Sequence, residues 1–274
     1  METLLVADSF RVRERERTAE ARMPGLHLDR FREGVAAVLE GSVAAGLLSG
    51  SRRDDWWELV FEPFMKTAPE RIAAGGAGFP RLELLGPEGG EGGEASGAEP
   101  RLGVRIRPLP RLTASLELRS APSTTLVTPR LKGPNIGRLA ALNRELGAEA
   151  LLLDRSGGAV EGATTSLLWW DGGTLCATAS EERVDSVTER LVIAIAERRG
   201  DPVERRSCRP DQIAAHEVWA VNALHGIRRA TRIDGAPTGS PDHRRLADFR
   251  DALEDAWRPI DGHEDEDDGK PDGA

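Results

Sequence analysis

The chain has no tyrosine and few cysteines, lysines and aromatic residues, and these scarcities narrow its possible functions. Its two cysteines, Cys176 and Cys208, are too few for a disulfide framework or a cysteine-based zinc site, so we expect buried thiols and no metal site. No apolar run approaches the roughly 18 residues that span a bilayer, which argues against an integral membrane protein. Charges from Asp8 onward break the N-terminal apolar stretch, unlike a signal peptide, so we expect a cytoplasmic protein.

Most of the net charge lies in one segment. Residues 261–274 carry seven acids against one lysine and supply −6 of the net −9. This composition cannot bury apolar surface, so we predict a disordered acidic tail. The rest of the chain is close to neutral, and its basic residues are spread along it rather than clustered. We therefore expect small-molecule chemistry and no nucleic-acid partner.

Lysine is scarce, because 34 of the 37 basic residues are arginine. A guanidinium cannot be deprotonated, so a function that needs a free amine has to retain a lysine. Lys270 lies in the acidic tail and Lys66 on the polar side of a predicted helix, whereas Lys132 opens a Gly-Pro-Asn turn. Lys132 is therefore the candidate for chemistry.

Apolar spacing and turn residues predict alternating helices and short strands. Helices are expected over 28–48, 53–74, 136–147, 186–199, 209–215 and 241–258. Strands are expected over 3–12, 79–86, 102–109, 113–119, 149–154, 159–170 (in two pieces), 174–179, 202–208, 217–222 and 227–233. This order favours an α/β (α+β) fold with several hairpins.

Two segments without core-forming side chains divide the chain. Residues 86–100 are rich in glycine and glutamate and predict a flexible loop between two strands. Residues 121–130 mix proline, serine and threonine and predict an interdomain linker. We therefore expect an N-terminal α/β domain over 1–120 and a mostly β C-terminal domain over 131–260.

Several segments occur together in a characteristic order. Lys132 is followed by GAEALLLDRSGGAVEGATTSLLWW, SVTER and HEVWAVNALHGIRRATRIDG, and the N-terminal third adds ADSFRV and HLDRF. This ordered set resembles the class IV aminotransferase family. The resemblance implies a two-domain fold type IV enzyme with a larger C-terminal pseudo-barrel domain that binds pyridoxal 5′-phosphate.

The resemblance also implies roles that suit the chemistry of each side chain. Lys132 matches the Schiff-base lysine, which needs a lowered pKa to supply a free amine. Glu161 matches the glutamate beside the pyridine nitrogen, where a carboxylate favours the protonated ring. Arg30 matches the phosphate arginine, although an arginine on a helix can also face solvent. Val187 and Thr188, at a predicted helix start, match the amides and hydroxyl of the phosphate cup.

The remaining candidates lie in a loop that should line the cofactor or substrate side. Asn222 and Ala223 match cofactor-binding positions, but many relatives have a hydroxyl residue in place of Ala223, which leaves that contact to backbone amides. His225 follows them, and we interpret it as a loop histidine because Lys132 can carry the acid–base chemistry. The missing tyrosine leaves the cofactor's O3′ to Asn135 or to water.

The residues that bind substrate stay open at this point. Arg105, Arg107 and Arg119 lie on strands that border the cleft in relatives, and any of them could meet a substrate carboxylate. Trp169 and Trp170 could frame an aromatic substrate, but consecutive strand residues face opposite sides of a sheet, which favours packing in the core.

Three functions are compatible with these residues. The first is a class IV aminotransferase with an amino donor and a keto-acid acceptor. The second is a 4-amino-4-deoxychorismate lyase that releases pyruvate and forms 4-aminobenzoate, since the lyase branch shares Asn-Ala-Leu at positions 222–224. The third is a degenerate member without catalysis, which a colourless purified protein would reveal. The resemblance also implies a homodimer.

Overall fold

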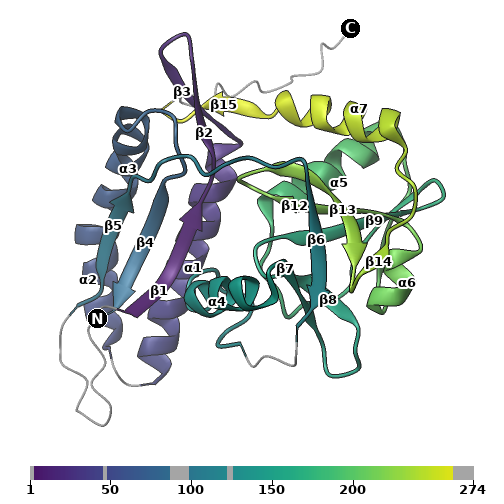
Figure 1. The fold of residues 1–274 in the computed structure, drawn as a ribbon. Helices are drawn as coiled ribbons and strands as arrows, with labels where there is room; N and C mark the ends of the chain where they lie inside the picture. The colour runs from purple at the N-terminus through teal and green to yellow at the C-terminus, as the bar shows by residue number, and fades with distance from the viewer. Residues whose placement is uncertain (1–2, 46–47, 87–98, 122–125, 262–274) are drawn as a thin grey trace, which may run out of the picture.

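The computed structural model describes residues 3–45, 48–86, 99–121 and 126–261. Figure 1 shows three sheets, with the N-terminal elements on one side and the large C-terminal sheet on the other. Most of the predicted loop 86–100, part of the predicted linker 121–130 and nearly all of the predicted tail 261–274 lie outside the described residues.

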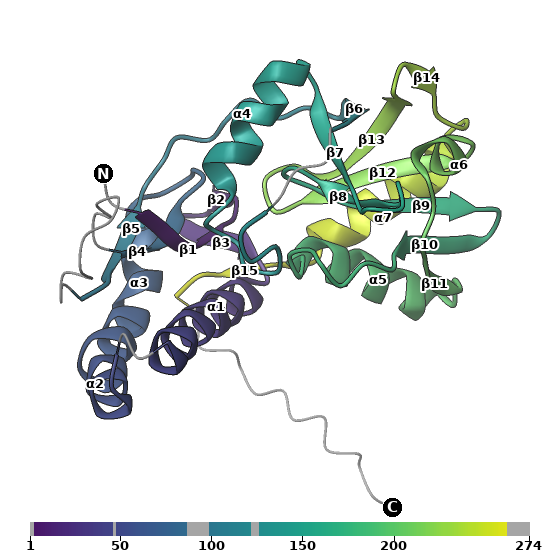
Figure 2. The same cartoon turned by 90° about the horizontal axis from the view of Figure 1, so that it is seen from below.

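The N-terminal part is a small antiparallel sheet covered by helices, and Figure 2 shows the helices side by side on its face. Its strand order is β1-β4-β5, with β1 (Thr3–Ser9), β4 (Arg81–Gly86) and β5 (Arg101–Arg105). Its helices are α1 (Pro24–Ala44), α2 (Gly50–Trp56), the π-helical turn η1 (Trp57–Phe61) and α3 (Glu62–Ala74). The predicted helices are confirmed, but α1 begins four residues early, because proline is favoured at a first helical position.

A second small sheet joins the two ends of the chain. It contains β2 (Val12–Arg15), β3 (Thr18–Arg22) and β15 (Trp257–Pro259) in the order β15-β3-β2. These strands are short and rich in charged residues, so apolar runs did not predict them, and the predicted strand 3–12 divides into β1 and the start of β2. The predicted helix 241–258 is correspondingly shorter, as α7 (His243–Glu254), because the chain then extends to pair with β3.

The C-terminal part is a curled nine-stranded sheet with the order β11-β10-β9-β12-β13-β6-β7-β8, to which β14 adds beside β13. Its strands are β6 (Ser115–Ser120), β7 (Glu149–Leu153), β8 (Ala159–Gly162), β9 (Ser166–Asp171), β10 (Thr174–Thr178), β11 (Val203–Arg206), β12 (Glu217–Asn222), β13 (Gly226–Ile233) and β14 (Ala236–Pro237). Its helices are α4 (Ile136–Leu146), α5 (Val187–Arg199), α6 (Pro210–Ala214) and α7. The predicted elements of this part are confirmed within a few residues, apart from the short β14.

The two faces of this sheet bury separate cores. Trp170 packs with α5 and α7 on one face, and Trp169 packs with α6 on the other. Both tryptophans are fully enclosed, which confirms core packing for the pair and leaves neither in the pocket described below. The interdomain boundary stays a prediction, but β6, which we placed on its N-terminal side, pairs with β13 and β7 of the large sheet.

Candidate active site

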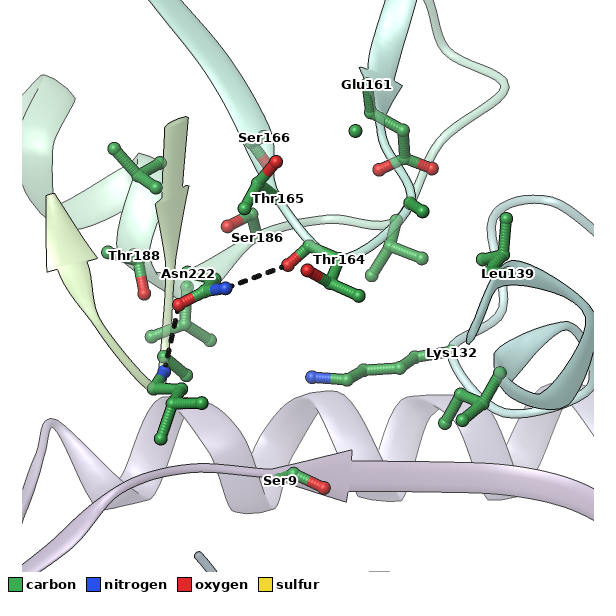
Figure 3. A pocket seen from close by; sticks show the side chains of 18 of the residues that line it. Ser9, Lys132, Leu139, Glu161, Thr164, Thr165, Ser166, Ser186, Thr188 and Asn222 are labelled. Atoms are coloured by element: carbon green, nitrogen blue, oxygen red, sulfur yellow. Dashed lines mark hydrogen bonds between the residues drawn. The ribbon is translucent and has the colours of Figure 1, made fainter. Parts of the chain in front are cut away.

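A cavity of about 320 Å³ opens between the N-terminal elements and the large sheet. Its walls come from β1, α1, the turn before α4, the β8–β9 turn, the start of α5 and the β12–β13 loop. Figure 3 shows polar side chains from these elements converging on one space. The cavity brings together every cofactor-binding residue that the sequence predicted: Arg30, Lys132, Glu161, Val187, Thr188, Asn222 and Ala223.

Lys132 stands in the turn before α4, and this turn is held against β1. The Lys132 carbonyl accepts a hydrogen bond of 2.8 Å from the Ala7 N–H. Gly133 has a φ of 147°, and a Cβ there would lie 2.8 Å from the Leu5 carbonyl oxygen, so the close approach requires glycine. The Lys132 side chain extends from this anchored turn, and Figure 3 shows its Nζ in the cavity facing Thr164.

The surroundings of Lys132 favour its neutral amine. Burial lowers its pKa to about 8, and the positive charges of Arg30 and Arg107 act in the same direction. The carboxylates of Asp8 and Glu161 oppose this effect without cancelling it. An amine with this pKa can act both as a nucleophile and as a proton carrier near neutral pH.

Arg30 is fixed by a buried carboxylate rather than facing solvent, and its side chain is only 12% exposed. Its Nε and Nη2 donate to the two carboxylate oxygens of Asp8 at 2.7 and 3.0 Å, and its Nη1 donates to the Asp185 carbonyl at 2.7 Å. A guanidinium has five N–H groups, and the remaining N–H of Nη2 faces the His27 Nδ1 at 3.4 Å, so one N–H, on Nη1, remains for an anion in the cavity. Because Asp185 lies just before α5, these contacts place Arg30 beside the start of that helix.

Sequence reasoning missed Asp8, which is hydrogen-bonded to Arg30, and His27, which contacts Asp8. The His27 Nδ1 lies 2.9 Å from the Asp8 carboxylate. Burial alone would raise the pKa of Asp8, but the charges of Arg30 and Lys132 and the hydrogen bond with His27 hold it well below its usual range. Burial lowers the pKa of His27 to about 4, so its ring is neutral at pH 7. Both residues lie in the ADSFRV and HLDRF segments, but only the fold shows that they meet.

The first turn of α5 offers a second group of anion donors. The Ser186 Oγ accepts the Glu189 N–H at 3.3 Å, so Ser186 is the N-cap of α5, at the predicted helix start. The N–H groups of Val187 and Thr188 have no partner within the helix, because the first residues of any helix lack an acceptor in the preceding turn. Thr188 is buried and lines the cavity with its hydroxyl (Figure 3). Helix dipole, amides and hydroxyl together suit a phosphate.

Glu161 is a buried carboxylate at the end of β8, and Figure 3 shows its oxygens turned toward the cavity. Burial raises its pKa to about 8, and this effect exceeds the opposing effects of the Val184 backbone N–H and the Arg183 charge. A carboxyl group with this pKa shares a proton readily with a basic ring nitrogen. It therefore fits the role beside the pyridine nitrogen that the sequence predicted.

The amide side chain of Asn222 is committed to the protein's own backbone. Its Nδ2 donates to the Thr164 carbonyl at 3.1 Å, and its Oδ1 accepts the N–H groups of Leu224 and His225. Asn222 thus connects the β8–β9 turn to the β12–β13 loop, which presents the backbone of Ala223 to the cavity.

The sequence indicated Asn135 or water for the cofactor's O3′ and predicted that His225 is a loop histidine. The Asn135 side chain bonds both the N–H and the carbonyl of Val127, at 3.0 and 2.7 Å, which leaves one N–H of its amide for the cofactor oxygen that the missing tyrosine would hold. Burial and the charge of Arg228 lower the pKa of His225 to about 4. A neutral ring held by its own loop agrees with a loop histidine.

Of the three arginines considered for the substrate carboxylate, only Arg107 lines the cavity. Its Nε donates to the Phe79 carbonyl and its Nη2 to the Ser9 Oγ, both at 3.0 Å. Arg105 is 58% exposed and pairs with Glu83. Arg119 donates to a carbonyl elsewhere on the surface. The sequence did not separate them, because the predicted strand 102–109 ends at Arg105 in the structure, as β5, and Arg107 lines the cavity from the segment that follows.

Two classes of site find no support in the described part of the chain. None of its helices is long and apolar enough to cross a membrane. The same residues contain no group of three or more histidine, cysteine, aspartate or glutamate side chains that could hold a metal ion.

Comparisons with known proteins agree with this geometry. The family model described as amino-transferase class IV matches residues 7–233. A search of curated proteins finds no match.

Several solved structures share the fold at low sequence identity. A branched-chain amino acid aminotransferase from T.th. with pyridoxamine 5′-phosphate is 19% identical with a TM-score of 0.72, over 93% of this chain and 89% of that chain. A candidate 4-amino-4-deoxychorismate lyase from Legionella pneumophila is 17% identical with a TM-score of 0.67, over 92% of this chain and 90% of that chain. A branched-chain aminotransferase from Thermoproteus uzoniensis is 18% identical with a TM-score of 0.70, over 93% and 89% of the two chains.

These likenesses confirm the fold class that the sequence predicted, the two-part α/β fold of fold type IV enzymes. The family match spans most of the chain and includes Lys132, Glu161 and the start of α5. The chain therefore belongs to the class IV aminotransferase family, whose members are pyridoxal-phosphate-dependent aminotransferases and lyases.

Proposed function

We propose that the chain is an aminotransferase that acts on an amino acid or related amine, with Lys132 bonding pyridoxal 5′-phosphate. The observation that carries this proposal is the cavity amine of Lys132, whose pKa is lowered to about 8 in the same space as a protonatable carboxyl group and a helix N-terminus. Pyridoxal phosphate, when bound, supplies an aldehyde that condenses with amines and a ring that draws electrons from the substrate α-carbon.

The residues of the cavity fit the groups of this cofactor. Arg30 retains one free N–H group, on Nη1, beside the start of α5, where Val187 and Thr188 offer two amides and a hydroxyl for a phosphate. Glu161 can share its proton with the ring nitrogen. The cavity therefore has a cationic end for phosphate and an acidic group for the ring, with the amine of Lys132 in the same cavity.

Lys132 has a second task in this proposal. Once the substrate amine is bound, its free Nζ takes the proton from the substrate α-carbon and returns it at a neighbouring carbon. A base with a pKa of about 8 is suited to both directions of this transfer near neutral pH. Arg107 is the residue we propose for a substrate carboxylate, because it is fixed by two hydrogen bonds and lines the cavity.

A lyase activity is the second candidate, favoured by Asn222-Ala223-Leu224 and by the structural likeness to the Legionella protein. The two activities differ in their need for an acceptor. An aminotransferase given only an amino donor stops after one equivalent of keto acid, whereas a lyase given aminodeoxychorismate releases pyruvate continuously. Continuous pyruvate release without a keto acid would therefore replace the first proposal with the second.

The direct test is reduction of the cofactor-loaded protein with borohydride, followed by intact mass measurement and peptide mapping. We expect one pyridoxyl group per chain, on Lys132, and none in the Lys132→Arg variant. Lys66→Arg is the matched control and should retain the full adduct, since Lys66 lies on α3 outside the cavity. An adduct on Lys66, or none in the wild type, would refute the assignment.

The assembly and location are further proposals. We propose a homodimer in the cytoplasm, on the basis of the family resemblance. Sedimentation velocity at micromolar concentration tests the first, with a mass near twice the 29.6 kDa of one chain as the expected result. Cell fractionation tests the second.

A further inference from the structure

Arg228 is a buried arginine without a partner among the described residues. It is only 8% exposed, and it lines the cavity. No hydrogen bond or ion pair from the described part of the chain reaches its guanidinium, and its Nε is fully enclosed without an acceptor. A buried charge is stable only when it is paired and hydrogen-bonded, so an unpaired guanidinium in a cavity indicates a binding site for an anion.

The register of the sheet explains why the protein does not neutralise this charge. Arg228 pairs with Ala220 of β12, which in turn pairs with Leu167 of β9. Side chains of directly paired residues share one face, so the neighbours of Arg228 across these strands are apolar. Glu149 on β7 attracts the charge, but it accepts hydrogen bonds from Asn143, Thr164 and Thr165 instead.

The cavity contains a second cation that lacks a carboxylate partner. Arg107 is held by neutral oxygens, those of Phe79 and Ser9. Glu83 attracts its charge but forms its ion pairs with Arg81 and Arg105 instead. Arg30, by contrast, is already paired with Asp8 and stands at the phosphate end. If Arg30 binds the cofactor phosphate, two cavity guanidiniums remain without a bound carboxylate. Arg107 lies beside β1, and Arg228 lies on β13.

We infer that Arg228 binds a second carboxylate of the substrate, so that the enzyme prefers dicarboxylic amino compounds over monocarboxylic ones. Arg107 holds one carboxylate and Arg228 the other, and each charge is neutralised only when both are present. This inference rests on the proposed function, because it concerns the substrate of the same cavity. It makes Arg228 a specificity-determining residue, although the sequence assigned it no role within the segment HEVWAVNALHGIRRATRIDG.

The test is calorimetric binding of two five-carbon acids, glutarate and pentanoate, to the cofactor-loaded protein. These probes have the same chain length, so their difference reports the second carboxylate. In wild type we expect glutarate to bind about 10- to 100-fold more tightly than pentanoate, the range for a charge-assisted hydrogen-bonded pair. In Arg228→Met this preference should disappear, while pentanoate affinity stays within about twofold of wild type.

Arg232→Met is the matched control, because Arg232 lies on the same strand but is exposed and bonds Gly235 outside the cavity. It should retain the glutarate preference. Arg228→Lys keeps the positive charge but lacks the planar guanidinium, and it should retain part of the preference for glutarate over pentanoate. This variant keeps the test valid if Arg228→Met folds poorly. Equal binding of the two acids by wild type, or an unchanged glutarate preference in Arg228→Met, would overturn the inference.

Measurements of stability and cofactor affinity distinguish substrate binding by Arg228 from a purely structural role and from binding of the cofactor phosphate. Removing an unpaired buried charge should raise the Tm of Arg228→Met in the absence of ligand, whereas loss of a structural arginine would lower it. If Arg228→Met instead bound pyridoxal phosphate more weakly, the anion would be the cofactor phosphate and the inference would be wrong. The borohydride adduct on Lys132 does not depend on Arg228, so failure of the dicarboxylate preference leaves the proposed function intact.

Discussion

Substitutions of two neighbouring charged residues, Asp8 and Arg30, should shift the pKa of Lys132 in opposite directions. Asp8 raises this pKa and Arg30 lowers it, although the two residues bond each other. Asp8→Asn should therefore lower the pKa of Lys132 further, and Arg30→Gln should raise it. Asp8→Asn preserves side-chain size, whereas Arg30→Gln shortens the side chain but keeps a polar amide, and each substitution removes one charge.

The expected magnitude follows from the neutral fraction of the amine. A pKa of about 8 leaves roughly 9% of Lys132 neutral at pH 7. If one removed charge is worth about one pKa unit, or about 1.4 kcal/mol, Asp8→Asn raises the neutral fraction about fivefold and Arg30→Gln lowers it about tenfold. Asp8→Asn also leaves a buried guanidinium unpaired, which costs about 3–5 kcal/mol of stability, so its unfolding is measured first.

The assay uses pyridoxal, which lacks the phosphate and so does not report on the phosphate contacts of Arg30. The rate of adduct formation on Lys132 is followed from pH 6 to 9 by borohydride quenching and intact mass. Arg119→Gln removes the same charge outside the cavity and serves as the control. The reasoning would be refuted if the two pH profiles moved in the same direction, or if both stayed within about 0.3 units of wild type.

Four further predictions concern the phosphate, Glu161 and the C-terminus. Thr188→Val should weaken cofactor affinity about tenfold and Arg30→Gln about 10- to 100-fold, and a double-mutant cycle should show coupling because both contact one phosphate; strictly additive losses would contradict a shared site. Glu161→Gln should retain bound cofactor but lower turnover about 100-fold, and unchanged turnover would reject the role. Because its pKa is raised, Glu161 holds a proton in the folded state. The free energy of unfolding of cofactor-free wild type should therefore fall by up to about 4 kcal/mol, relative to that of Glu161→Gln, as pH rises from 4.5 to 8. Urea titrations that show the same pH dependence for the two proteins would argue against this. Deleting 261–274 should leave the Tm unchanged, whereas deleting 255–274 should lower it by several degrees because β15 then no longer pairs with β3.

The sequence by itself determined the features that depend on neighbours along the chain. Apolar spacing predicted most helices and strands, since burial of one face requires a period of 3.6 or 2 residues. The caps at Ser186 and Gly147 were predictable because capping is a local interaction. The scarcity of lysine singled out Lys132, and the order of the motifs around it predicted the family.

Only the tertiary structure decided how charges are paired in the cavity. Asp8 and Arg30 are 22 residues apart, and a local pattern gives no reason to join them. Arg107 rather than Arg105 or Arg119 reaches the cavity because of the direction in which its segment faces. Arg228 lies in one of the motif segments, but the sequence assigned it no role, since its importance lies in the apolar residues that the sheet register places beside it. Long-range register and burial set these environments, and both depend on the whole fold rather than on any one segment.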